Sequence, residues 1–243
     1  MSSTNPRFEQ GPPAEDIKSL FGSIAHGYDT ANDWMTGGLA RGWRRKLVKQ
    51  SQVKPGEHVL DCATGTGDLA IEFAKVTGAE GKVVGTDFCK EMLEFAPSKA
   101  KKAGVEASFS IADATQLPFE NESFDVVSIA YGIRNVDNPK TAIAEMRRVC
   151  KPGGRVMILE TGDQQNPMIR SAFNWYFRNV VPRIGGMITG RKSAYEYLQN
   201  SSSQFPSGSE FLKLMQEAGE FEITECFALM GGASFIYKGL VKS

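Results

Sequence analysis

The stretch VLDCATGTGDLA, residues 59–70, is an apolar run that leads into a glycine turn and then into an apolar helical pattern. Gly65, Gly67 and Ala70 match the spacing G-x-G-x-x-[GA], and Asp87 follows Gly67 by 20 residues. In such a unit the glycines let the backbone approach a ligand, and the later carboxylate accepts hydrogen bonds from ribose hydroxyls. The alternative is a tight turn between strand and helix that binds nothing.

Segments of strand and helix character alternate around this turn. Apolar runs bounded by glycine, proline or charge predict buried strands at 58–62, 82–87, 106–111, 124–131 and 155–160. Helical patterns fall between them near 67–77, 89–103 and 138–150. The alternation predicts an α/β fold with a doubly wound parallel sheet, whose ligand lies at the carboxyl ends of the strands.

The pattern changes towards the C-terminus. Residues 168–190 form an apolar helical stretch rich in aromatic side chains, followed by YEYL, a polar QNSSSQ turn and a helix near 208–218. Two strand-like runs, near 222–229 and 233–241, are joined by two glycines, which is typical of an antiparallel hairpin.

The composition fits one large domain in a reducing compartment. Of the 243 residues 41% are hydrophobic, enough for a single core, so we expect one domain over 16–243 behind a loose polar tail, residues 1–15. Basic and acidic residues balance, 28 against 28, which leaves no net field to attract nucleic acid. The four cysteines are far apart and form no cluster with the two histidines, so no metal site is expected. No signal peptide or membrane span is recognisable, and a cytoplasmic location is expected.

Three features favour S-adenosylmethionine over a dinucleotide or a nucleoside triphosphate. The turn has no Lys-Ser/Thr pair, which excludes a P-loop. It carries Asp61 and Asp68, whose charges would repel a pyrophosphate but suit an ammonium and a sulfonium. The segment ADATQLPF, residues 112–119, brings Asp113 to the expected position of adenine, where a carboxylate accepts from the exocyclic amine.

Longer motifs identify the chain more closely: LDCATGTGD, GTDF, ADATQLPF, SFDVVSIAYGIRNV and RVCKPGGRVMILE. Together they resemble the class I methyltransferases, and specifically the C-methyltransferase family of menaquinone and ubiquinone biosynthesis. The resemblance runs from about Leu20 to Lys242. It implies a Rossmann-like, mostly parallel seven-stranded sheet with a C-terminal antiparallel hairpin. It also implies lid helices over 16–50 and a helical insertion on the substrate side over 165–205.

The resemblance implies the reaction and the cofactor site. The reaction is C-methylation of a prenylated quinol by S-adenosylmethionine, with either demethylmenaquinol or the benzoquinol precursor of ubiquinone as substrate. Family contacts fall on Thr66 in the turn, on Asp87 at the ribose, and on Asp113 with Ala114 near adenine, while a family serine after the fourth strand is Ala130 here. The full cofactor-binding set that we expect is Asp61, Thr64, Gly65, Thr66, Gly67, Asp87, Phe88, Asp113, Ala114 and Ala130.

The chain departs from the family pattern at positions that bear on the substrate. The usual YDxMN is YDTAN, with Ala31 in place of methionine, and a serine shortly after it is Thr36. Histidines of the family are replaced by Ala40, before Arg-x-Trp, and by Tyr237, near the C-terminus. These departures leave a soluble phenolic or polyketide-like molecule open as an alternative acceptor.

The chemistry of the ring predicts the catalytic residues. A ring carbon ortho to a quinol hydroxyl becomes nucleophilic when the hydroxyl ionises, and ionising a phenol of pKa near 10 at pH 7 costs about 4 kcal/mol. A fixed cation beside the phenolate lowers that cost, and Arg134, after the fourth strand, is the expected cation. Asn135 is expected to orient a hydroxyl or a water, and Tyr28 with Asp29 to close the site and relay a proton. The alternatives are a surface salt bridge for Arg134 and core packing for Tyr28.

Two segments without acidic residues suggest contact with the membrane in which prenylated quinols reside. They run from Arg41 to Lys54 and from Met168 to Lys192, and the second mixes basic with aromatic side chains. Such segments suit an anionic lipid surface, so peripheral contact at the inner face of the membrane is expected. The alternatives are a solvated basic face over core-facing aromatic residues, and a homodimer in which a second copy covers the apolar stretch.

Three other function classes share part of the pattern. A nicotinamide-dependent dehydrogenase has the same turn, but neither histidine follows the carboxyl end of a strand, where it would transfer a proton. A methyltransferase of nucleic-acid bases usually has Pro-Pro-Tyr or Pro-Cys after the fourth strand, where this chain has AYGIRN. A third class keeps the fold without catalysis, as a cofactor-binding subunit of a quinone-synthesis assembly; intact Asp61, Gly65, Gly67 and Asp87 argue against a decayed site.

Overall fold

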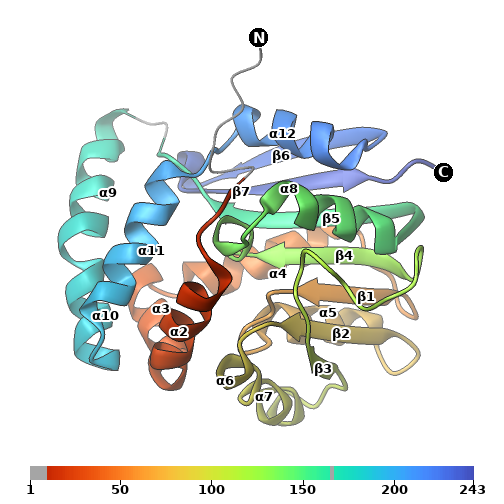
Figure 1. Cartoon of the computed structure of the whole chain (residues 1–243), viewed down its shortest axis with the longest axis horizontal. Helices are drawn as coiled ribbons and strands as arrows, with labels where there is room; N and C mark the ends of the chain where they lie inside the picture. The colour runs from red at the N-terminus through yellow and green to blue at the C-terminus, as the bar shows by residue number, and fades with distance from the viewer. Residues whose placement is uncertain (1–9, 165–166) are drawn as a thin grey trace.

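The computed structural model describes residues 10–164 and 167–243, and these contain a seven-stranded sheet in the order β3-β2-β1-β4-β5-β7-β6 (Figure 1). The strands are β1 His58–Cys62, β2 Lys82–Asp87, β3 Ser108–Ile111, β4 Phe124–Ala130, β5 Cys150–Thr161, β6 Ile223–Leu229 and β7 Ser234–Leu240. β1 to β5 are mutually parallel, and β7 lies antiparallel between β5 and β6. The predicted mostly parallel sheet with a C-terminal antiparallel pair is therefore confirmed.

Helices cover both faces of the sheet and one of its ends (Figure 1). The α-helices are α2 Ala14–Ile24, α3 Tyr28–Thr36, α4 Leu39–Ser51, α5 Asp68–Thr77, α6 Lys90–Leu93, α7 Ala96–Lys102, α8 Pro139–Val149, α9 Pro167–Asn179, α10 Val181–Thr189, α11 Lys192–Gln204 and α12 Ser209–Gly219. Short 3-10 turns are η1 Ala25–Gly27, η2 Ile133–Asn135 and η3 Met230–Gly232. α4 and α5 pack on one face, and α8 and α12 pack on the other.

The central strands divide their side chains between two cores, as the two-residue period of a strand requires. In β5, Val156 and Ile158 join the core beneath α8 and α12. Met157 and Leu159, which alternate with them, join the core beneath α4 and α5. Burial on both faces explains why these strands are continuous apolar runs in the sequence.

Several element boundaries differ from the sequence prediction. β3 begins at Ser108 and is largely exposed, because it is the edge strand of the sheet rather than a buried one. The helix expected over 89–103 is broken into α6 and α7, and Pro97, which has no N–H to donate, lies in the first turn of α7. β5 begins earlier than expected, at Cys150, which pairs with Phe124 of β4.

The segment QNSSSQ, residues 199–204, is the end of α11 and not the predicted turn. Ser201 and Ser203 donate their hydroxyls to main-chain carbonyls three residues earlier, so these polar side chains are satisfied within the helix. The helix ends at Gln204, and the next residue, Phe205, is extended because it precedes Pro206.

The predicted lid and substrate-side segments share a core of their own. α2 and α3 pack with α9, α10 and α11 around buried side chains that include Ala31 and Tyr195. We call these five helices the helical cover; in Figure 1 it lies beyond one end of the sheet. The Tyr176 hydroxyl donates to the carbonyl of Met35 at 3.0 Å and ties α9 to α3. α4, the last helix of the predicted lid segment, packs on the sheet instead.

The predicted tail, residues 1–15, falls largely on residues 1–9, which lie outside the described residues. Within the described part, the N–H of Gly11 donates to the carbonyl of Asp137 at 2.6 Å, and α2 begins at Ala14. None of the helices in the described ranges has the length and apolar character needed to cross a bilayer.

Candidate active site

The strand order reverses at β1, which lies between β2 and β4. The chain moves from β1 to β2 and β3 on one side, and to β4 and β5 on the other, so a crevice opens at the carboxyl ends of β1 and β4. The glycine turn, residues 63–67, follows β1, and Tyr131 and Gly132 follow β4 at the same edge. The predicted site therefore lies where open α/β sheets bind ligands.

The glycine turn has a backbone that few residues adopt. Ala63, Gly65 and Gly67 have positive φ angles of 45°, 58° and 86°. A Cβ at Gly67 would also come within 2.9 Å of the Ala96 side chain, so both conformation and space require glycine there. α5 begins immediately after the turn, at Asp68, and directs its N-terminus towards the crevice.

Asp87 ends β2 and braces the glycine turn. Its carboxylate accepts the N–H of Gly65 at 2.8 Å and the N–H of Cys89 at 2.9 Å. Burial raises the pKa of Asp87 to about 6, although these main-chain donors act to lower it. A carboxylate has about four acceptor positions, so Asp87 retains capacity for the hydroxyls of a ligand.

A cavity, which we call the turn pocket, lies where the ends of β1 to β4 meet α2. The expected cofactor-binding residues that line it are Gly65, Asp87, Phe88, Asp113, Ala114 and Ala130. Its other walls are Ala14, Ile17, Phe21, Tyr28, Ala63, Met92, Ala112, Tyr131, Gly132, Asn135, Val136 and Asp137. Carboxylates at Asp87 and Asp113 among mostly apolar walls match a nucleoside, whose base is flat and apolar and whose ribose and amine groups donate hydrogen bonds.

The remaining expected cofactor residues, Asp61, Thr64, Thr66 and Gly67, are not among the residues that line the turn pocket. They lie in or next to the glycine turn, and three of them make side-chain contacts that hold it. Asp61 is only 1% exposed, and accepts the hydroxyls of Thr64 at 2.6 Å and Ser128 at 2.8 Å. Burial raises the pKa of Asp61 to about 6. Thr66 donates its hydroxyl to Asp29 of α3 at 2.7 Å. These contacts hold the shape of the turn.

A second cavity of about 410 Å³, which we call the cover pocket, lies beneath the helical cover. Tyr28 and Tyr131 line both cavities, which therefore adjoin. The apolar and aromatic walls are Trp34, Met35, Leu39, Ala40, Trp43, Tyr176, Phe177, Val181, Tyr195, Leu198, Met230 and Ala233, and the other walls are Asn32, Thr36, Gly37, Arg44, Arg134, Thr161, Gln199, Ser202 and Ser234. The size and the walls suit an aromatic ring with an apolar substituent.

A buried ion pair lies at the wall of the cover pocket. Arg134, 7% exposed, donates to Glu160 near the end of β5, which is 1% exposed. The arginine is in a salt bridge, as the alternative interpretation had it, but the bridge is buried rather than at the surface. Within the described residues, Arg134 Nε and Glu160 Oε2 have no hydrogen-bond partner. Unpaired buried polar atoms cost about 1–3 kcal/mol each, so the pair marks a place for a polar group.

Tyr131 joins the two cavities and has a strained backbone. Its φ of 58° lies in the left-handed region, which a bulky side chain adopts at a cost. The guanidinium of Arg44 lies 6.0 Å from the centre of its ring. The hydroxyls of Tyr131 and of Ser234 on β7 are buried and find no partner in the part of the chain that the structure describes. Neither Tyr131 nor Glu160 was predicted from the sequence; for Glu160 the available signal was a lone carboxylate at the end of the apolar run VMILE.

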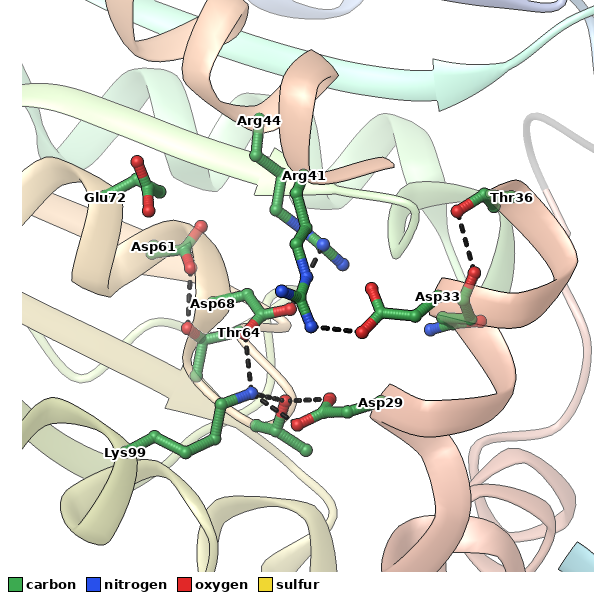
Figure 2. Close-up of polar contacts among 12 residues, drawn as sticks. Asp29, Asp33, Thr36, Arg41, Arg44, Asp61, Thr64, Asp68, Glu72 and Lys99 are labelled. Atoms are coloured by element: carbon green, nitrogen blue, oxygen red, sulfur yellow. Dashed lines mark hydrogen bonds and ion pairs between the residues drawn. The ribbon is translucent and has the colours of Figure 1, made fainter. Parts of the chain in front are cut away.

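The structure brings most of the predicted catalytic residues to the junction of the two cavities. Tyr28 lines both, Arg134 lines the cover pocket and Asn135 lines the turn pocket. Burial raises the pKa of Tyr28, which keeps its hydroxyl protonated at neutral pH. Asp29 points instead into a polar cluster, where its carboxylate contacts Lys99 (Figure 2). It also accepts the hydroxyl of Thr66.

The positions that depart from the family pattern have different surroundings. Thr36 and Ala40 line the cover pocket. Ala31 is fully buried in the core of the helical cover. Tyr237 is also buried, and its hydroxyl accepts the N–H of Gly208 at 2.7 Å. Two of these replacements are thus structural, and two face the space expected for the acceptor.

Comparison with known proteins places this site in a family. The sequence model of the ubiE/COQ5 methyltransferase family matches residues 10–241. The chain belongs to the ubiE/COQ5 family. One relative, the ubiquinone/menaquinone biosynthesis C-methyltransferase UbiE of Bdellovibrio bacteriovorus, is 52% identical over 231 residues, which are 95% of this chain and 98% of the relative.

Solved structures confirm the fold of this ubiE/COQ5 family member. A SAM-dependent methyltransferase from Aquifex aeolicus has a TM-score of 0.59 at 19% identity, covering 82% of this chain and 89% of that one. The cyclase SpnF has a TM-score of 0.65 at 14% identity, covering 97% and 98%. The second neighbour is a cyclase, so at this level of identity the likeness shows the class I methyltransferase fold alone.

Proposed function

We propose that the chain transfers a methyl group from S-adenosylmethionine to a ring carbon of a prenylated quinol in menaquinone or ubiquinone biosynthesis. The observation that carries this proposal is the junction at Tyr28 and Tyr131, where a pocket suited to a nucleoside meets an apolar pocket with a buried cation. Membership of the ubiE/COQ5 family and the name of the relative at 52% identity support the same reaction.

The residues of the turn pocket fit S-adenosylmethionine. Asp87 would hold the ribose hydroxyls and Asp113 the adenine amine, while Phe88, Met92 and Ala114 supply apolar contacts for the base. When bound, the cofactor supplies an electrophilic methyl group on a sulfonium. Asp87 is the last residue of β2, and Asp113 lies two residues beyond the end of β3, so the sheet fixes their separation.

The residues of the cover pocket would prepare the acceptor. Arg134 stabilises the phenolate that forms when the ring hydroxyl loses its proton, because a preorganised cation acts strongly where water is excluded. Glu160 holds the guanidinium in place. The ring carbon would take the methyl group as the methyl–sulfur bond breaks, which would leave the neutral thioether S-adenosylhomocysteine. Loss of the proton from that carbon and reprotonation of the ring oxygen would then restore the aromatic quinol. An oxidised ring has no hydroxyl to ionise, so the reduced quinol is the substrate.

We also propose that the acceptor enters from a membrane surface. Trp34, Leu39 and Met230 line the cover pocket and are 69%, 42% and 53% exposed, so apolar side chains surround its mouth. Arg41 and Arg45 of α4, the helix that begins at Leu39, are exposed, and Arg41 is paired with Asp33. Aromatic and basic side chains together suit the interface of an anionic bilayer.

A soluble phenolic acceptor is the second candidate, because Thr36 and Ala40 replace family residues in the wall of the cover pocket. The test offers methyl-labelled S-adenosylmethionine with demethylmenaquinol, the benzoquinol precursor, or a soluble phenol, and locates the methyl group by mass spectrometry. We expect a carbon-bound methyl group on one of the prenylated rings. Methylation of the soluble phenol alone, or on oxygen, would contradict the proposed substrate.

A further inference from the structure

The ammonium of Lys99, on α7, joins three separate segments of the chain (Figure 2). It donates to Asp29 Oδ2 of α3 at 2.5 Å, to Thr66 Oγ1 in the glycine turn at 2.8 Å, and to Asp68 Oδ1 at the start of α5 at 2.5 Å. A lysine ammonium has three donors, and all of them are used here. The side chain of Lys99 is 25% exposed, so these contacts are partly shielded from solvent.

The contacts extend from Lys99 to the walls of both cavities. Thr66, which lies behind the turn pocket, donates to the other oxygen of Asp29 at 2.7 Å. The second oxygen of Asp68 pairs at 3.1 Å with Arg44, which lines the cover pocket. We call Asp29, Arg44, Thr66, Asp68 and Lys99 the latch cluster. Burial alone would raise the pKa of Asp68, but Arg44 and Lys99 hold that pKa below its usual range. The carboxylates of Asp29 and Asp68 therefore balance the charges of Arg44 and Lys99.

The helix that Lys99 tethers is part of the wall of the turn pocket. Ile17 and Phe21 of α2 and Tyr28, the first residue of α3, line that pocket from the side of the helical cover. A nucleoside bound there would lie against α2 and α3, so movement of these helices would open a path for it to leave. Asp29 directly follows Tyr28, so its contact with Lys99 fixes the covering helix next to the ligand.

We infer that Lys99 is a positioning residue that fastens the helical cover over the bound cofactor and sets the rate at which the cofactor product leaves. The inference rests on the proposed function for the identity of that ligand. Without Lys99, Asp29 and Asp68 lose their shared counter-ion and face each other as like charges, which disfavours the closed position of α3. Arg44 keeps its own ion pair with Asp68.

The kinetic test measures release of S-adenosylhomocysteine by stopped-flow displacement. Lys99→Met keeps much of the side-chain length and removes the charge, and Lys101→Met on the exposed side of the same helix is the matched control. We expect release to be about tenfold faster from Lys99→Met and unchanged from Lys101→Met. Asp29→Ala should act in the same direction, and the effects of the two changes should be less than additive in the double variant, because both remove the contact between Lys99 and Asp29. Wild-type release from Lys99→Met would overturn the inference.

A second readout needs no ligand. Amide hydrogen exchange over residues 14–36 is expected to quicken in Lys99→Met relative to the wild type and Lys101→Met, while β1 and β4 keep their protection. Equal quickening in β1 and β4 would show a general loss of stability and would contradict a latch. If the wild-type chain bound no S-adenosylmethionine, the proposed function would fail, yet this experiment would still decide whether Lys99 fastens α2 and α3.

Discussion

At the scale of single residues, the pairing of Arg134 with Glu160 explains how a cation can be placed inside an apolar cavity. An unpaired guanidinium with 7% exposure would carry a desolvation cost of several kcal/mol. Glu160 compensates that charge from the end of β5, and one of its oxygens and one guanidinium nitrogen remain unpaired within the described residues. The arrangement gives a fixed donor group that still has capacity for a ring oxygen.

Arg134→Lys is expected to lower kcat about a hundredfold while the Kd for S-adenosylmethionine stays within about twofold. Lysine keeps the charge near Glu160, but it lacks the planar fork that can bond the carboxylate and the ring oxygen together. Glu160→Gln should lower kcat in the same way, whereas Glu225→Gln, in the more exposed pair with Lys238, should not. Normal turnover in Arg134→Lys and Glu160→Gln would remove the pair from the reaction.

Cofactor affinity is expected to fall as the pH falls through about 6. Burial raises the pKa of Asp87 to about 6, and only the ionised carboxylate accepts from both ribose hydroxyls. Below that pKa, protonation of Asp87 competes with cofactor binding. The affinity should therefore fall with decreasing pH, by at most about tenfold for each pH unit. Calorimetric titration between pH 5 and 7.5 measures this. Asp87→Asn should bind weakly without the pH dependence; a flat wild-type profile would contradict the role of Asp87.

Residues next to strand ends were predictable, and those that act across the fold were not. Asp87, Asp113 and Ala130 line the turn pocket because the carboxyl ends of parallel strands meet at one edge. Lys99 contacts Asp29 across 70 residues of sequence, and no local spacing indicates such a pair.

At the scale of elements, the strands were easier to predict than the helical cover. Strands buried on both faces are apolar throughout, and β3 was also predicted as a strand, but the sequence did not indicate that it is the exposed edge of the sheet. The apolar faces of α2, α3 and α9 to α11 indicate burial but do not say against what. Their common core joins the N-terminal helices to the helices that follow β5, so it depends on contacts between segments far apart in the sequence. The helical cover and the sheet therefore have separate cores, so a substitution in one core is expected to disturb the other less.

Gly185→Ala is expected to weaken the helical cover more than the cofactor site. A Cβ at Gly185 would lie 2.3 Å from the ring of Tyr195, and overpacking of this kind costs about 1–3 kcal/mol. We expect a raised KM for the quinol with a smaller change in the Kd for S-adenosylmethionine. Gly42→Ala, on α4 where the added Cβ meets open space, is the control and should leave both constants unchanged. Equal effects of the two substitutions would argue against this packing.

At the scale of the whole molecule, the cover pocket opens among exposed apolar side chains on a chain of zero net charge. Attraction to a lipid surface must therefore come from local groups, namely Trp34 and Leu39 at the mouth and the basic residues of α4. Such a surface would let a prenyl tail pass from the bilayer into the pocket without exposure to water.

Flotation with vesicles that contain anionic lipid tests this surface. We expect a bound fraction that is high at low salt, decreases as salt screens the basic residues, and falls several-fold in Trp34→Ser. Ile111→Ser, which removes a comparably exposed apolar side chain from β3, is the control and should not change the bound fraction. Equal loss in the two variants, or no binding of the wild type at low salt, would contradict the proposed membrane contact.

The measurement that tests the central proposal most directly is methyl transfer to one prenylated ring offered in its reduced and in its oxidised form. Labelled S-adenosylmethionine, the purified chain and detergent-dispersed demethylmenaquinone are combined with and without a chemical reductant, and the labelled product is quantified. The proposal predicts a carbon-methylated product from the quinol and none from the quinone, because only the quinol has a hydroxyl to ionise beside Arg134. Equal labelling of the two forms, or binding of cofactor with no labelling of this ring or of the benzoquinol precursor, would contradict it.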